Sequence, residues 1–192
     1  MIEQRCNLTA FGKILGILSA IVAYPFIVLS IAISPWFNLF DNALSDLGNV
    51  AQQGGTAWIY NVGLMLTGLF ATLFAIIASV QHPLLRYRVW TMPLTATGID
   101  LALIGFFPEN AGRIHGLVSV IFFALIAITM LIYSYSSWPL GSPRIGALAL
   151  AFGIACPIVW FVEWPWHGVA IQETITATMM AIWLILVSLN NI

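Results

Sequence analysis

The chain has 192 residues, of which 61% are hydrophobic and only 7% are charged, with a net charge of −1 at neutral pH. A water-soluble domain of this length needs far less apolar sequence for its core. The composition therefore predicts an integral membrane protein, with residues 1–192 as a single domain and membrane lipids as its surroundings. The balanced charge, without a basic run, excludes a nucleic-acid-binding surface.

Six apolar segments approach the roughly 20 residues that a helix needs to cross a hydrocarbon core of about 30 Å. Short connections with Pro or Gly separate most of them, which predicts that consecutive helices lie antiparallel. We therefore expect an all-α, polytopic membrane protein with six transmembrane helices. The expected spans are Lys13–Ser34, Ala57–Ser79, Val89–Phe107, His115–Ser137, Ile145–Val162 and Ile171–Ile192.

The first connection, residues 34–56, is the only long one. Its apolar residues Trp36, Phe40, Leu44 and Leu47 recur at helical spacing, with polar residues between them. This pattern predicts an interfacial amphipathic helix in the first outer loop. We expect the helix to lie with its aromatic side chains toward lipid and its carboxylates toward water or the ends of the spanning helices.

Asp100 lies inside the third span, about 10 Å below the outer end of that span at 1.5 Å per residue. A carboxylate at this depth costs at least about 3 kcal/mol on insertion scales. We expect the side chain to point into the bundle, with Asn61 of the second span as its hydrogen-bond partner. A working intramembrane acid and a bond that holds helices together are equally good interpretations.

The basic residues predict the orientation, because Lys and Arg are retained on the cytoplasmic side of a membrane. Of the six bases, only Arg113 falls in an odd-numbered connection. Both termini are therefore predicted to be cytoplasmic, in a multi-pass protein of the cell membrane. The other bases are Arg5, Lys13, Arg86, Arg88 and Arg144.

Acids and two of the three histidines gather in the connections predicted to face outward. Asp46, His115, His167 and Glu173 offer the mixed nitrogen and oxygen donors of a zinc or other divalent site, although no His-x-x-x-His or Cys-x-x-Cys fixes one. His115 and Ser119 stand one turn apart on one helix face, where they could act as base and nucleophile. The sequence specifies no cofactor.

Several short pieces of the sequence stand in a particular order and spacing: Leu44-Ser45-Asp46-Leu47-Gly48, Tyr60-Asn61-Val62-Gly63-Leu64, Gly68, Phe74-Ala75, Gly105-Phe106-Phe107-Pro108, His115-Gly116 and Ser119. Taken together, they resemble the six-helix membrane family known as domain of unknown function nine-nine-eight. The Ser-Asp-x-Gly piece is also distantly similar to an element of the Frag1, DRAM and Sfk1 membrane proteins. Neither resemblance supplies an established reaction, but the first implies that Asp46, Asn61 and His115 occupy patterned positions of the family.

The leading functional hypothesis is an extracytoplasmic polar pocket, formed by the outer helix ends, that binds a lipid head group or another small polar ligand. Asp46 and His115 are expected to share this site as a carboxylate–imidazole pair within hydrogen-bond reach. The additional members expected in the ligand-binding site are Arg113, His167 and Glu173.

Three other functions stay open. The chain could be a membrane-embedded hydrolase or transferase, with or without a metal, in which His115 and Asp46 act on a water or on Ser119. It could instead be a subunit of a larger membrane complex, or a homo-oligomer, that docks through a ridge of small residues at 12, 16 and 20. A proton-coupled carrier that uses Asp100 is the fourth hypothesis.

Overall fold

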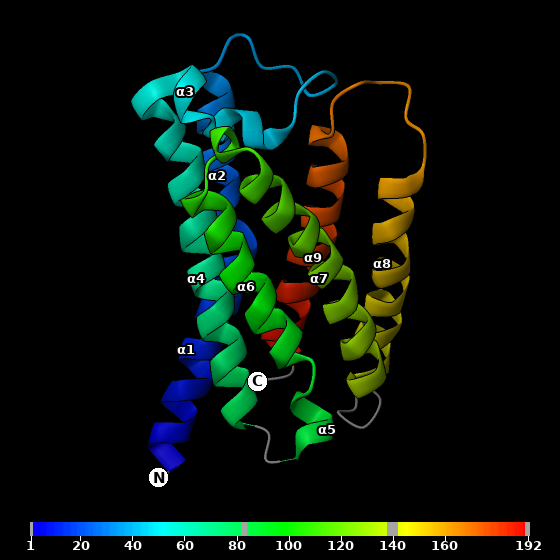
Figure 1. The fold of residues 1–192 in the computed structure, drawn as a ribbon. Helices are drawn as coiled ribbons and strands as arrows, with labels where there is room; N and C mark the ends of the chain where they lie inside the picture. The colour runs from blue at the N-terminus through cyan, green and yellow to red at the C-terminus, as the bar shows by residue number, and fades with distance from the viewer. Residues whose placement is uncertain (1, 82–83, 138–141, 191–192) are drawn as a thin grey trace.

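The computed structural model describes residues 2–81, 84–137 and 142–190, and the regular elements of these residues are all helical (Figure 1). Seven longer helices make the body of the molecule, and five short helical turns connect them. The long helices are α1 Ile2–Ile21, α2 Ala23–Ala32, α4 Ala57–Gln81, α6 Thr91–Phe106, α7 Arg113–Ser137, α8 Pro143–Phe161 and α9 Ala170–Asn190. The short ones are η1 Leu44–Gly48, α3 Val50–Gln53, η2 Gly54–Thr56, α5 Leu85–Arg88 and η3 Glu109–Ala111.

The prediction of an all-α, polytopic membrane protein is confirmed. Within the described residues, five helical stretches are long and apolar enough to cross a membrane, and α6 is a shorter apolar helix of 16 residues. The first stretch is divided between Ile21 and Ala23, because Pro25 has no N–H to donate to the Ile21 carbonyl. The five stretches are Leu8–Ala32, Val50–Gln81, Arg113–Ser137, Pro143–Phe161 and Ala170–Asn190.

The two ends of the bundle differ in their sequence. Figure 1 shows the N- and C-terminus at one end, together with α5, which carries Arg86 and Arg88. The opposite end is formed by the odd-numbered connections, residues 34–56, 108–112 and 162–169, and we call it the cap. The basic residues thus separate along the bundle as the antiparallel order requires, while the side of the membrane that the cap faces stays a prediction.

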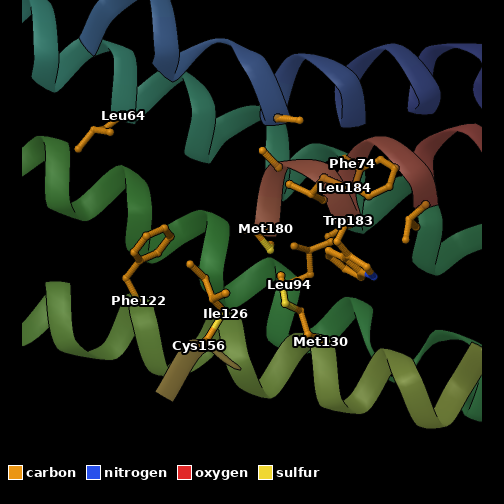
Figure 2. Close-up of a cluster of buried hydrophobic side chains, with 14 of the residues drawn as sticks. Leu64, Phe74, Leu94, Phe122, Ile126, Met130, Cys156, Met180, Trp183 and Leu184 are labelled. Carbon is orange, nitrogen blue, oxygen red and sulfur yellow. The ribbon is translucent and has the colours of Figure 1, made fainter. Parts of the chain in front are cut away.

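An aromatic cluster fixes the end of the bundle opposite the cap. Trp90, Tyr133 and Trp183 are fully buried and meet edge to face, with ring centroids 5.1–6.0 Å apart. Figure 2 shows Phe74, Leu94, Met130 and Leu184 near Trp183 in this core. Edge-to-face rings contribute beyond their buried area, so this cluster holds α6, α7 and α9 together at this end of the bundle.

Small residues allow close contacts between helices, and these contacts lie inside the chain. A Cβ on Gly68 of α4 would lie 2.4 Å from the Gly98 carbonyl oxygen of α6, so their backbones nearly touch. The small-residue ridge at positions 12, 16 and 20 is buried as well, and a Cβ on Gly16 would lie 2.0 Å from Ser188 Oγ of α9. This ridge is not free to dock a partner, because α4 and α9 of the same chain pack against it, while a partner subunit or a homo-oligomer stays a prediction.

The predicted interfacial helix over residues 34–56 is also corrected, because the segment forms turns as far as Ala43 and then η1, α3 and η2. Asn38 Oδ1 accepts a hydrogen bond from Phe40 N at 3.0 Å, and Asn42 Oδ1 accepts one from Asn38 N at 2.9 Å. These asparagine side chains take the amides that a helix would use. Leu44 is buried in the bundle instead of lying in lipid.

Candidate functional site

In the cap, backbone hydrogen bonds join the fifth connection, residues 162–169, and the start of α9 to the first connection, residues 34–56. The N–H groups of residues 167–170 donate to the carbonyl oxygens of Phe40 and Asn42 at 2.7–3.1 Å. A Cβ on Gly168 would lie 2.4 Å from both the N and the O of Asn42, so the contact requires glycine. Phe40 and Trp166 add an edge-to-face ring contact with centroids 5.9 Å apart. Two segments that are remote in sequence therefore form one surface.

Two carboxylates from different elements hold the start of η1. Asp46 Oδ2 accepts hydrogen bonds from Ala43 N and Asn42 Nδ2, each at 3.0 Å. Glu173 Oε2, in the first turn of α9, accepts one from Leu44 N at 2.6 Å. Consecutive amides thus each receive a carboxylate oxygen, as at the capped N-terminus of a helix. Asp46 is occupied with this capping.

Further bonds tie the cap to α4 and to the third connection. Asn61 Nδ2 donates to the Gly48 carbonyl oxygen at 2.9 Å, and both residues are buried. Asn49 Nδ2 donates to Glu109 Oε2, and Val50 N donates to Asn110 Oδ1 at 3.0 Å. The first connection is therefore anchored at both of its ends.

His115 is 7% exposed at the start of α7, and its Nδ1 lies 2.8 Å from the Phe107 carbonyl oxygen. Because a carbonyl only accepts, Nδ1 must carry the hydrogen in this bond. In the neutral ring the remaining nitrogen, Nε2, is then an acceptor. No hydrogen bond joins His115 to Ser119, so the hydrolase hypothesis lacks its base–nucleophile contact.

Among the described residues no hydrogen bond joins Asp46 to His115, so the predicted carboxylate–imidazole pair is not formed: Asp46 Oδ2 bonds to the start of η1, and His115 Nδ1 bonds to Phe107. Arg113 and His167 are exposed. Among the described residues, no group of three or more His, Cys, Asp and Glu side chains could hold a metal ion. The candidate metal ligands Asp46, His115, His167 and Glu173 are therefore at one end of the bundle without forming a metal centre.

Asp100 is buried as predicted, with 7% of its surface exposed, but the predicted bond to Asn61 is wrong. Asn61 donates to Gly48 instead, and Asp100 Oδ2 has no hydrogen-bond partner among the described residues. Asn61 bonds elsewhere because it lies near the cap end of α4, beneath η1, where the Gly48 carbonyl oxygen is within reach.

A central cavity of about 140 Å³ lies inside the bundle. Side chains of α1, α2, α4, α6, α7 and α9 surround it, and most of this wall is apolar, as at Leu64, Phe122 and Leu184. The cavity reaches the cap at Leu44 and Ser45 of η1. Its polar residues at that end include Tyr60.

A second space, the lateral groove, has a volume of about 480 Å³ and lies between α7 and α8, below η1 and the start of α9. Gly116, Val120 and Ala124 of α7 line it and are exposed, as are Pro157 and Phe161 of α8. The groove therefore opens on the outer surface of the bundle. In Figure 1 the cap ends of α7 and α8 stand apart, whereas the helices meet at the other end.

The two spaces share four lining residues: Ser45, Ser119, Phe123 and Glu173. Of the predicted ligand-binding residues, Glu173 lines both spaces and His115 lines the groove, whereas Asp46, Arg113 and His167 line neither. Sequence reasoning missed Ser45 and Tyr60 as lining residues. The only sequence feature that pointed to Ser45 and Tyr60 was their position in the pieces Leu44–Gly48 and Tyr60–Leu64. The same pieces contain Asp46 and Asn61, which were the predicted site residues.

The pieces that carried the family resemblance meet in this region. Asp46 caps η1, Asn61 binds Gly48, and His115 binds Phe107. The family comparison agrees with the resemblance, whereas the similarity to Frag1, DRAM and Sfk1 proteins stays untested. No curated protein and no solved structure matches the chain significantly. Residues 17–190 match the family model described as Protein of unknown function (DUF998), and the chain therefore belongs to that family.

Proposed function

We propose that this membrane protein binds a single amphiphilic lipid, with the polar head below the cap and the apolar chain along the lateral groove, reaching into the central cavity. One observation carries the proposal: a cavity inside the bundle and a groove on its surface share Ser45, Ser119 and Glu173 at the level of the cap. An apolar interior that ends in a few polar side chains is typical of ligand sites.

The lateral groove would give the lipid a path from the bilayer. Its exposed residues Val120, Ala124 and Phe161 lie on membrane-spanning helices, on the surface that lipid tails would contact. An acyl chain loses little by moving from the bilayer into an equally apolar cavity, so the chain alone gives little affinity. Selection of the ligand must then come from its head group, at Glu173 and its neighbours.

The placement of the basic residues supports an orientation with the cap on the side away from the cytoplasm, which in the cell membrane is the outside. In that orientation the head group would be held near the outer surface, the location expected for the extracytoplasmic pocket. The site nevertheless differs from the expected one, since its walls are transmembrane helices and its polar groups are few.

Native mass spectrometry of the purified protein tests the proposal. Ala177 lines the central cavity, so Ala177→Phe should fill the space and remove a co-purifying lipid. Ala151→Phe adds the same ring to an exposed position on α8 and should leave the lipid bound. We expect one lipid per chain in the wild type and in Ala151→Phe. Equal lipid retention in both variants, or no retained lipid in the wild type, would contradict the proposal.

A further inference from the structure

Resting on the proposed function, we infer that the bound amphiphile has a hydrogen-bond-donating head group without negative charge, such as a hydroxyl or an ammonium group. Lipids with phosphate or carboxylate heads would be excluded. The side chains where the central cavity and the lateral groove meet favour such a head group through their charges and their hydrogen-bonding capacity.

The ionisable side chains around this junction are mainly acidic. Glu173 lines both spaces, and Asp46 follows Ser45 directly in η1. Neither space is lined by a Lys or Arg among the described residues. Arg113, the base nearest in sequence to His115, is exposed and lines neither space. An anionic head group would thus leave water for a site with a carboxylate and no lining cation, which is unfavourable in a low-dielectric region.

Two of the hydrogen-bonding groups that the protein leaves open here are acceptors, and an open donor, Trp160 Nε1, is buried in the wall of the lateral groove. Glu173 uses Oε2 for the Leu44 amide, and no partner of its Oε1 is found among the described residues. His115 donates through Nδ1 to Phe107, which leaves Nε2 as an acceptor in the neutral ring. Both acceptors belong to residues that line the lateral groove, so a donating head group placed there has acceptors on α7 and α9, while the Ser45 and Ser119 hydroxyls can adapt to either role.

A matched series of ligands isolates the head group, because cetyl alcohol, cetylamine, palmitate and cetyl phosphate have similar chains. Each is titrated into delipidated protein at a mildly alkaline pH, where the Glu173 carboxyl is ionised and the amine keeps its charge, with native mass spectrometry as the readout. We expect the alcohol and the amine to bind at least about tenfold more tightly than the two anions, as is usual for hydrogen bonds to a charged group.

Two variants locate the effect. Glu173→Gln keeps an oxygen that can accept from Leu44 N but removes the charge, so it should weaken cetylamine binding by about tenfold and strengthen palmitate binding. Glu163→Gln removes an exposed acid that lines neither space and should change neither affinity.

The outcomes separate the two proposals. Binding of palmitate or cetyl phosphate as tight as that of the alcohol would overturn the head-group inference and leave the proposed function standing. The same holds if none of the four ligands binds while Ala177→Phe still loses a lipid that the wild type retains. If no ligand binds and no lipid is retained, both proposals are wrong.

Discussion

Asp100 on α6 and Asn61 on α4 are both buried polar side chains, but only one of them has a hydrogen-bond partner for its buried polar atom. Asn61 is buried and has a partner in Gly48, so its amide contributes to the attachment of η1. Asp100 is buried, and its Oδ2 lacks a partner among the described residues. A buried polar atom that gives up water without gaining a hydrogen bond destabilises the fold.

We therefore predict opposite effects on stability for two substitutions to leucine. Asp100→Leu should raise the thermal unfolding midpoint in detergent, because it removes a polar atom that costs about 1–3 kcal/mol when unpaired. Asn61→Leu should lower the midpoint by a similar free energy, because it leaves the Gly48 carbonyl oxygen unpaired. Both midpoints are measured at one scan rate against the wild type. A lower midpoint for Asp100→Leu would mean that the carboxyl group has a stabilising partner.

The connections of the cap act as elements of tertiary structure because they bond to one another. Residues 167–170 donate to Phe40 and Asn42, Glu173 binds Leu44, and Asn49 binds Glu109. Each of these contacts joins segments that are far apart in sequence, so closing them costs chain entropy that the hydrogen bonds must offset. A disturbance in one connection should therefore loosen the others.

Gly168→Ala tests this coupling. The added methyl group would overlap the backbone of Asn42 and should cost roughly 1–3 kcal/mol, as overpacked sites do. We expect faster amide hydrogen exchange at residues 167–170 and also at Leu44. Gly55→Ala is the matched control, because no atom lies within 4 Å of its added Cβ. Unchanged exchange in Gly168→Ala would show that the two connections are independent.

At the scale of the whole molecule, the bundle has a firmly packed end and a capped end. The aromatic cluster of Trp90, Tyr133 and Trp183 fixes the first, while hydrogen-bonded connections close the second. The central cavity reaches the capped end, and the lateral groove opens there between α7 and α8. The orientation of the bundle therefore decides from which side of the membrane the polar groups of the site are reached.

The distribution of bases predicts that the cap faces outward. In a cysteine-free background, a single cysteine at Gln52 in the cap should react with an impermeant thiol reagent added to intact cells. A single cysteine at Leu84, next to the basic helix α5, should react only after the cells are opened. Both positions are exposed. The reverse labelling pattern would contradict the predicted orientation.

Much of the candidate site could not be predicted from the sequence, because local hydrogen bonds replaced the bond that was expected between distant segments. The motif pieces led to Asp46 and His115, yet the bond expected between them depended on two local choices. Asp46 takes the amide of Ala43, three residues away, and His115 takes a carbonyl oxygen eight residues away. Such short-range bonds cost little chain entropy and therefore compete well with a bond between distant segments.

The sequence by itself determined that this protein is a polytopic, all-helical membrane protein, because apolar length and the need to satisfy the backbone in lipid leave few other structures. It also determined which residues gather at each end, because antiparallel helices alternate their connections. Only the tertiary structure decided that residues 34–56 fold as hydrogen-bonded turns, that α9 covers the small-residue ridge, and that Glu173 lies where the cavity and the groove meet. Those features depend on which helix faces pack together, and hydropathy along a chain that is apolar on most sides does not encode that choice.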